Sequence, residues 1–79
     1  MELNVLLFAS YAEAVGAPSV AVSVRSGATV EDVLIAVRSM AGGRELPPAL
    51  VAVNQTYARP SDLVSVGDEI AIIPPVAGG

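Results

Sequence analysis

The sequence predicts an α+β domain in which a mixed β-sheet packs against one main helix. Short runs of β-branched and aliphatic residues, bounded by glycine, proline and asparagine, recur along the chain as expected for strands. One segment near the middle instead carries apolar residues at the 3.6-residue period of a helix. A single helix covers only one face of such a sheet, so the other face is expected to be wet.

The first half of the chain is expected to form a strand, a short helical turn and a second strand. Residues 3–8 are apolar on both faces of the first strand except at Asn4. Apolar residues then recur at helical spacing up to Gly16, which is placed to end a short helical segment. In residues 20–25, valines alternate with smaller or polar residues, a pattern typical of a half-exposed strand.

The main helix is predicted to begin after Thr29. This residue is a suitable N-cap, and Asp32 follows three positions later, close to the capping-box pattern. Gly42 and Gly43 are expected to end the helix. Its apolar stripe is formed by Val30, Val33, Leu34, Val37, Met40 and Ala41.

The second half of the chain is predicted to contain two more strands. Residues 50–53 form a short apolar run that leads into the turn-prone pair Asn54-Gln55. Residues 69–73 form the last strand, and the proline pair after it is expected to end it, because proline cannot donate a hydrogen bond to a sheet. Between the two strands, a single helical turn is expected to direct Leu63 into the core.

The first and last strands are apolar on both faces, which is unusual for a sheet with one wet face. If Val5 and Leu7 face the helix, the residue after each of them faces away. Residues 71–73 repeat this pattern in the last strand. The sequence therefore predicts an exposed apolar surface, with Phe8 and Ile73 on it. The alternative is that the short helical segment after the first strand folds over this surface and covers it.

Length and composition restrict both the fold and the chemistry. The chain has 79 residues, of which 53% are hydrophobic, and it has no Cys, His, Lys or Trp. One small core must therefore hold the fold by packing alone. Thiol nucleophiles, imidazole bases and the usual transition-metal ligands are missing, and the acidic side chains are scattered without a companion base. We expect no metal site and no catalytic activity of the chain by itself.

The charge of the chain indicates what kind of partner it meets. A formal net charge of −4 disfavours nucleic acid and anionic membrane surfaces. A protein with a basic surface is the natural complement, and Asp68 and Glu69 are expected to face it. The alternative for Asp68 is that it only caps a turn. The N-terminal residues show no signal peptide, and no apolar segment is long enough to span a membrane. We expect a soluble, cytoplasmic protein.

The sequence ends in Gly78-Gly79. Two residues without side chains make a thin strip of backbone that can enter a channel too narrow for any other residue. At a glycine frequency of about 7%, such an ending occurs by chance only ~0.5% of the time. We therefore predict a domain of residues 1–73 and a flexible tail, residues 74–79, with the carboxylate of Gly79 as the chemical site.

Five short blocks carry a resemblance to a known family. In chain order they are VLLFA at 5–9, AEAVG at 12–16, VAVNQ at 51–55, GDE at 67–69 and PPVAGG at 74–79. Together they resemble the small subunit of molybdopterin synthase, over essentially the whole chain. That family consists of ubiquitin-like sulfur carriers, so the resemblance implies a β-grasp fold.

The resemblance also implies a role for the C-terminus. In this family an adenylating enzyme, similar to ubiquitin-activating enzymes, uses ATP to convert the terminal carboxylate, here Gly79, to an acyl-adenylate. Sulfur then displaces AMP and leaves a thiocarboxylate. The tail enters the large subunit of the synthase, where the sulfur is delivered to a pterin precursor of molybdopterin. The carrier itself binds no cofactor, and Gly78 keeps the thread narrow.

The expected partner-binding residues combine the apolar surface with the tail. Phe8 and Ile73 follow from strand alternation, and Tyr57 follows from its place after the turn and from the resemblance to an apolar contact of the family. The family often has aromatic residues where Ile72 and Ile73 stand, so this contact is expected to differ here. The tail contributes Pro74, Pro75, Val76 and Ala77.

Three other functions share some of these features. A sulfur carrier for thiamine thiazole or cysteine biosynthesis would use the same tail and the same activation but dock on a different acceptor. A ubiquitin-like conjugator would attach Gly79 to lysines of target proteins. A plain interaction module would not need Gly79 at all.

Overall fold

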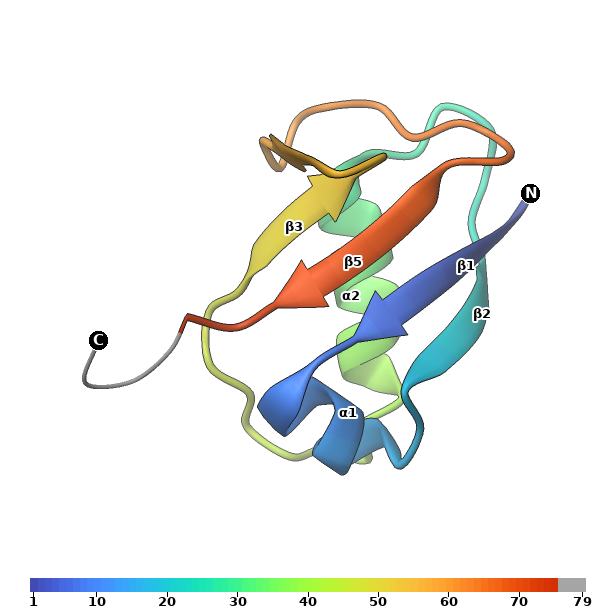
Figure 1. Ribbon diagram of the computed structural model, residues 1–79. Coiled ribbons are helices and arrows are strands. Elements are labelled where there is room, and N and C mark those ends of the chain that lie inside the picture. Colours follow the sequence, from blue (N-terminus) through green and yellow to red (C-terminus); the bar gives the residue numbers. More distant parts are fainter. Residues whose placement is uncertain (76–79) are drawn as a thin grey trace.

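The computed structural model of the protein describes residues 1–75. These residues form one mixed β-sheet with two helices. The strand order across the sheet is β2-β1-β5-β3-β4. Helix α2 crosses one face of this sheet, and α1 lies where β1 ends (Figure 1). The predicted α+β class is confirmed. The elements are β1 Glu2–Leu7, α1 Ala9–Val15, β2 Ser19–Ser23, α2 Val30–Ser39, β3 Leu50–Val53, β4 Thr56–Ala58 and β5 Glu69–Ile73.

The two strands at the centre of the sheet run parallel. β1 pairs with β5 in a register that places Leu7 opposite Ile72. The other neighbouring strands are antiparallel. Because the carboxyl ends of parallel strands meet at the same edge of a sheet, the residues after β1 begin beside the proline pair that follows β5.

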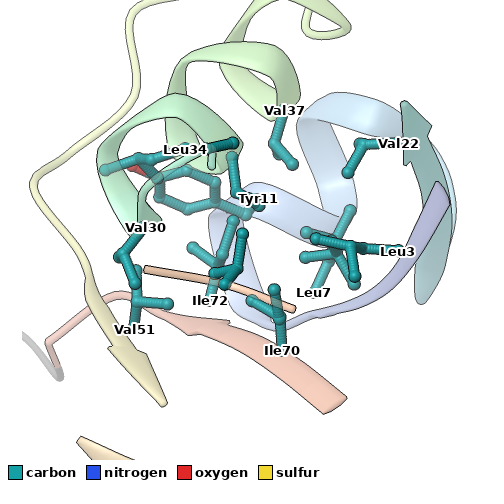
Figure 2. Packing of buried hydrophobic residues seen from close by; sticks show 14 residues of the cluster. Leu3, Leu7, Tyr11, Val22, Val30, Leu34, Val37, Val51, Ile70 and Ile72 are labelled. Atoms are coloured by element: carbon teal, nitrogen blue, oxygen red, sulfur yellow. The ribbon is translucent and has the colours of Figure 1, made fainter. Parts of the chain in front are cut away.

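The hydrophobic core lies between the sheet and the two helices (Figure 2). Alternate residues of β1 and β5 supply its sheet side, as the sequence pattern predicted, and Val5, Ile70 and Ile72 are fully buried. Tyr11 of α1 is equally buried. The complete cluster comprises Leu3, Val5, Leu7, Tyr11, Val22, Ala28, Val30, Val33, Leu34, Val37, Val51, Val64, Ile70 and Ile72.

Helix α2 begins as predicted but ends earlier. The Thr29 hydroxyl accepts a hydrogen bond from Asp32 N at 3.3 Å, and Asp32 Oδ2 accepts from Thr29 N at 2.9 Å, so the capping box is complete. The helix ends at Ser39, before the two glycines. Met40 is the C-cap and is 43% exposed, so its assignment to the apolar stripe was wrong.

The loop before β5 differs from the prediction. Asp62 Oδ2 accepts a hydrogen bond from Arg59 N at 2.9 Å, which closes a turn where a helical turn was expected. Leu63 then forms an isolated bridge with Thr29, and such extended backbone directs successive side chains to opposite sides. As a result Leu63 is 67% exposed, and its neighbour Val64 enters the core in its place.

The edge strand β4 was missed. Residues 56–58 are too few to show a period, and the strand exists because β3 offers a partner through a two-residue turn. The register places Tyr57 opposite Ala52.

The buried Tyr11 links α1 to the loop before β3. Its hydroxyl donates to the carbonyl oxygen of Pro47 at 2.5 Å, and Arg38 Nη2 donates to the same hydroxyl at 3.4 Å. Arg38 Nε is buried and has no partner within residues 1–75. The hydroxyl therefore serves two polar groups at the border of the core.

We predict that Tyr11→Phe lowers the free energy of unfolding by about 1–2 kcal/mol, because the Pro47 carbonyl loses its donor in a partly buried place. Urea denaturation followed by circular dichroism measures the change. Tyr57→Phe is the control, since Tyr57 is 68% exposed. An equal loss of stability in both variants would contradict the role assigned to the Tyr11 hydroxyl.

Candidate functional site

A shallow apolar groove runs across the face of the sheet opposite α2, and we refer to it as the outer groove. The registers align Leu6, Ala71, Ala52 and Tyr57 in one row across four strands. The two alanines at the centre of this row are short, so larger side chains around them leave a hollow of about 320 Å³. Its lining consists of Leu6, Phe8, Ala52, Gln55, Tyr57, Glu69, Ala71 and Ile73.

Phe8 lies on the outer groove because the chain reverses direction directly after it. Ala9 has a positive φ of 50°, and the Phe8 carbonyl accepts a hydrogen bond from Tyr11 N at 3.1 Å. This turn sends Tyr11 to the inner side and leaves Phe8 46% exposed. Helix α1 therefore does not cover the apolar surface, and the alternative in which it did is excluded.

Tyr57 and Ile73 line the same groove from two other strands. Tyr57 projects from the edge strand β4, and Ile73 is the last residue of β5, where it pairs with Leu50. Thus the structure brings together Phe8, Tyr57 and Ile73, as the sequence predicted. Their role in binding a partner stays a prediction.

The tail begins at the rim of the outer groove. Pro74 is buried, and Pro75 is exposed. The predicted role of both prolines in binding a partner stays a prediction. The remaining predicted tail residues, Val76, Ala77, Gly78 and Gly79, lie outside the described part of the chain.

The polar end of the groove is formed by Gln55 and Glu69, which sequence reasoning did not assign to the apolar surface. Neither residue carries a pattern that predicts this, because their neighbourhood depends on the pairing of β5 with β3. Glu69 is exposed, so its carboxylate is available to a partner.

Asp68 is engaged within the domain. Its Oδ1 accepts from Asn54 Nδ2 at 2.9 Å, and its Oδ2 accepts from Ser65 N at 2.7 Å. These two hydrogen bonds, the one from Asn54 first, lower the pKa of Asp68 below its ordinary value. Of the two acidic residues expected to face a basic partner, Asp68 therefore caps a turn, and Glu69 is the one that lines the groove.

The outer groove is mostly apolar and has few ionisable side chains. Its only ionisable side chains are those of Glu69 and Tyr57, and neither has a companion base. Within residues 1–75, His, Cys, Asp and Glu side chains form no group of three that could hold a metal ion. No helix of this region is long and apolar enough to cross a bilayer.

Comparison with known proteins shows the class to which these features belong. The chain is a member of the ThiS family, which matches residues 5–79. It is 37% identical to the molybdopterin synthase sulfur carrier subunit of Chlamydomonas reinhardtii, over 83 positions that cover all of both chains. The Arabidopsis thaliana protein of the same name is 34% identical, over all of this chain and 84% of its own.

Solved structures confirm the predicted β-grasp, ubiquitin-like fold. SAMP1 from Haloferax volcanii has a TM-score of 0.82 and 31% sequence identity, with complete coverage of both chains. A complex of subunits 1 and 2 of the molybdopterin-converting factor from Helicobacter pylori contains a chain that matches with a TM-score of 0.59 and 20% identity, again over both chains entirely. This second likeness is evidence for the fold alone.

The lowered pKa of Asp68 predicts an acid-sensitive contribution to stability. Because the folded pKa lies below the ordinary value of about 3.9, the contribution is complete above that pH and is lost as the pH falls through the folded pKa. We expect Asp68→Asn to lower the Tm at neutral pH and to flatten its decline between about pH 5 and pH 2. The Tm measured by calorimetry across this range checks it.

Glu13→Gln is the control for this measurement. Glu13 is exposed on α1, and the substitution also removes one carboxylate. Its Tm is expected to decline with pH in parallel with that of the unchanged protein. If the Asp68→Asn curve also ran parallel, the hydrogen bonds to Asp68 would not contribute to stability.

Proposed function

We propose that this protein is a sulfur carrier that acts as the small subunit of a molybdopterin synthase. The observation that carries the proposal is the full-length similarity to two molybdopterin synthase sulfur carrier subunits. The terminal diglycine and the outer groove beside the tail root support it, because they supply a thread for a narrow channel and a surface on which to dock.

The proposed chemistry takes place at Gly79. A carboxylate with a pKa of about 3.5 is ionised at neutral pH and is a poor electrophile until one of its oxygens becomes a leaving group. In the proposed sequence, this oxygen attacks the α-phosphate of ATP on an adenylating enzyme and releases pyrophosphate. A sulfur donor then displaces AMP and leaves a thiocarboxylate. The carrier binds no cofactor and supplies no acid or base to these steps.

The outer groove has a geometric reason to serve as the docking surface. Ile73 lines the groove and is also the last residue of β5, six positions before Gly79. Six residues reach at most about 20 Å. A large subunit that binds the groove therefore holds Gly79 within that distance of the contact. In the proposed function, a pocket of the large subunit receives the sulfur from Gly79 and transfers it to the pterin precursor.

A second candidate function is attachment to other proteins. The likeness to SAMP1 favours it, since the SAMP1 of Methanosarcina acetivorans, 30% identical to this chain, is named a small archaeal modifier protein. A carrier for thiamine thiazole or cysteine synthesis remains a third candidate. All three use an activated Gly79. They differ in whether its sulfur is delivered to a small-molecule acceptor or its carbonyl is joined to a lysine. Mass spectrometry of the chain after expression with its activating enzyme separates a Gly79 thiocarboxylate from an isopeptide bond to lysine.

We expect deletion of Gly79 to abolish molybdopterin formation, because the activated atom is removed. Gly78→Ala is expected to reduce it strongly, because a Cβ enters the channel and restricts the backbone. Both variants should keep the Tm of the unchanged protein. The measurement is molybdopterin synthesis with the large subunit, the activating enzyme and a sulfur donor. Full activity of the deletion variant would exclude the proposed function.

We predict that Phe8→Ala weakens binding to the large subunit roughly thirtyfold, since an aromatic residue at the centre of an interface is worth about 2 kcal/mol or more. Isothermal titration calorimetry measures the Kd. Leu63→Ala is the matched control, because Leu63 is also an exposed apolar residue but lies outside the groove. Equal affinities of both variants and the unchanged protein would show that the outer groove is not the docking surface.

A further inference from the structure

Asn54 combines a positive φ with side-chain hydrogen bonds to Asp68 and Glu69. Together with Gln55 it forms the two-residue turn between β3 and β4, and the φ angles of the two residues are 51° and 69°. Two successive residues with positive φ are typical of the type I′ turn, which matches the twist of the strands it joins. Asparagine adopts this backbone conformation more readily than most residues.

The Asn54 side chain continues the ladder between β3 and β5 at the point where the backbone leaves it. Its N–H donates to Glu69 O at 2.8 Å, and its Oδ1 accepts from Glu69 N at 2.9 Å. This is the exchange of two hydrogen bonds found in an antiparallel pair, with a side-chain amide in place of a backbone carbonyl. Asn54 Nδ2 also donates to Asp68 Oδ1 at 2.9 Å.

These three hydrogen bonds join two segments that line the outer groove. The first segment is the hairpin, which continues after Asn54 into β4 and Tyr57. The second is the start of β5 at Glu69. Within residues 1–75, β4 is an edge strand that pairs with β3 alone. Tyr57 is 68% exposed, so core packing does little to place it, and its position depends on the turn and on the pairing of β4 with β3.

We propose that Asn54 is a positioning residue for docking, which holds Tyr57 and the Glu69 carboxylate at the spacing that the partner recognises. The inference rests on the proposed function, because it takes the outer groove as the docking surface. Asn54 acts through Tyr57, so its effect on binding depends on the presence of the Tyr57 side chain.

A double-mutant cycle of Asn54→Gly and Tyr57→Ala tests this dependence. Glycine accepts the positive φ and removes both side-chain hydrogen bonds. We expect the Kd for the molybdopterin synthase large subunit of the same organism to rise roughly tenfold in Asn54→Gly. In the Tyr57→Ala background, the same change is expected to alter the Kd by less than about twofold, because coupled residues are not additive.

Asn4→Ala is the matched control. Asn4 lies opposite Glu69 in the pairing of β1 with β5, but its side chain makes no hydrogen bond within residues 1–75. Its Kd is expected to equal that of the unchanged protein. An unchanged Kd in Asn54→Gly, or equal effects of Asn54→Gly with and without the Tyr57 side chain, would overturn the proposal.

Two further measurements keep the test decisive. If the glycine variant unfolds, Asn54→Asp enters the same cycle, since aspartate keeps the acceptor for Glu69 N but loses the donor to Asp68. Hydrogen–deuterium exchange needs no partner, and we expect faster exchange at the Glu69 amide in Asn54→Gly with unchanged exchange at Ile72. If the Glu69 amide exchanged at the same rate in Asn54→Gly as in the unchanged protein, the positioning role would be overturned. Failure of the unchanged protein to bind the large subunit would instead count against the proposed function.

Discussion

The parallel pairing of β1 with β5 is the constraint on which the candidate site depends. It brings the residue that leaves β1, Phe8, to the edge of the sheet where Ile73 ends β5 and the proline pair begins. Parallel neighbours cannot be joined by a tight turn, and here most of the chain, including α2, lies between them (Figure 1). The outer groove and the tail root therefore come together only when the complete domain has folded.

Core packing and the groove use opposite faces of the same two strands. In β1 the core residues alternate with residues of the outer face, so Val5 and Leu7 are buried while Leu6 lines the groove. β5 shows the same division between Ile72 and Ile73. A slip of one residue would exchange the two faces and bury the groove residues in the core. The packing of the inner face, together with the register it enforces, thus determines which side chains the outer face presents.

The sequence was informative where a period extends over many residues. Alternation in β1 and β5 placed Phe8 and Ile73 on the outer face, and the α2 period with its capping box placed the main helix. It failed where a residue's direction depends on a distant partner. Leu63 turns outward because it bridges to Thr29, and the hollow exists because the registers bring Ala52 and Ala71 side by side. No local pattern contains either fact.

An apolar groove that faces solvent favours self-association, and the charge of this domain opposes it. Two copies that met through their grooves would bring both Glu69 side chains to the contact, and no arginine lines the groove to pair with them. A carboxylate that is buried in an interface without a partner is strongly unfavourable. A different protein with a basic side chain at this point would pair with Glu69 and still cover the apolar centre. One carboxylate at the end of the groove therefore disfavours contact with a second copy of the chain and favours contact with a basic side chain. Selectivity of this kind comes from an unfavourable contact as well as a favourable one.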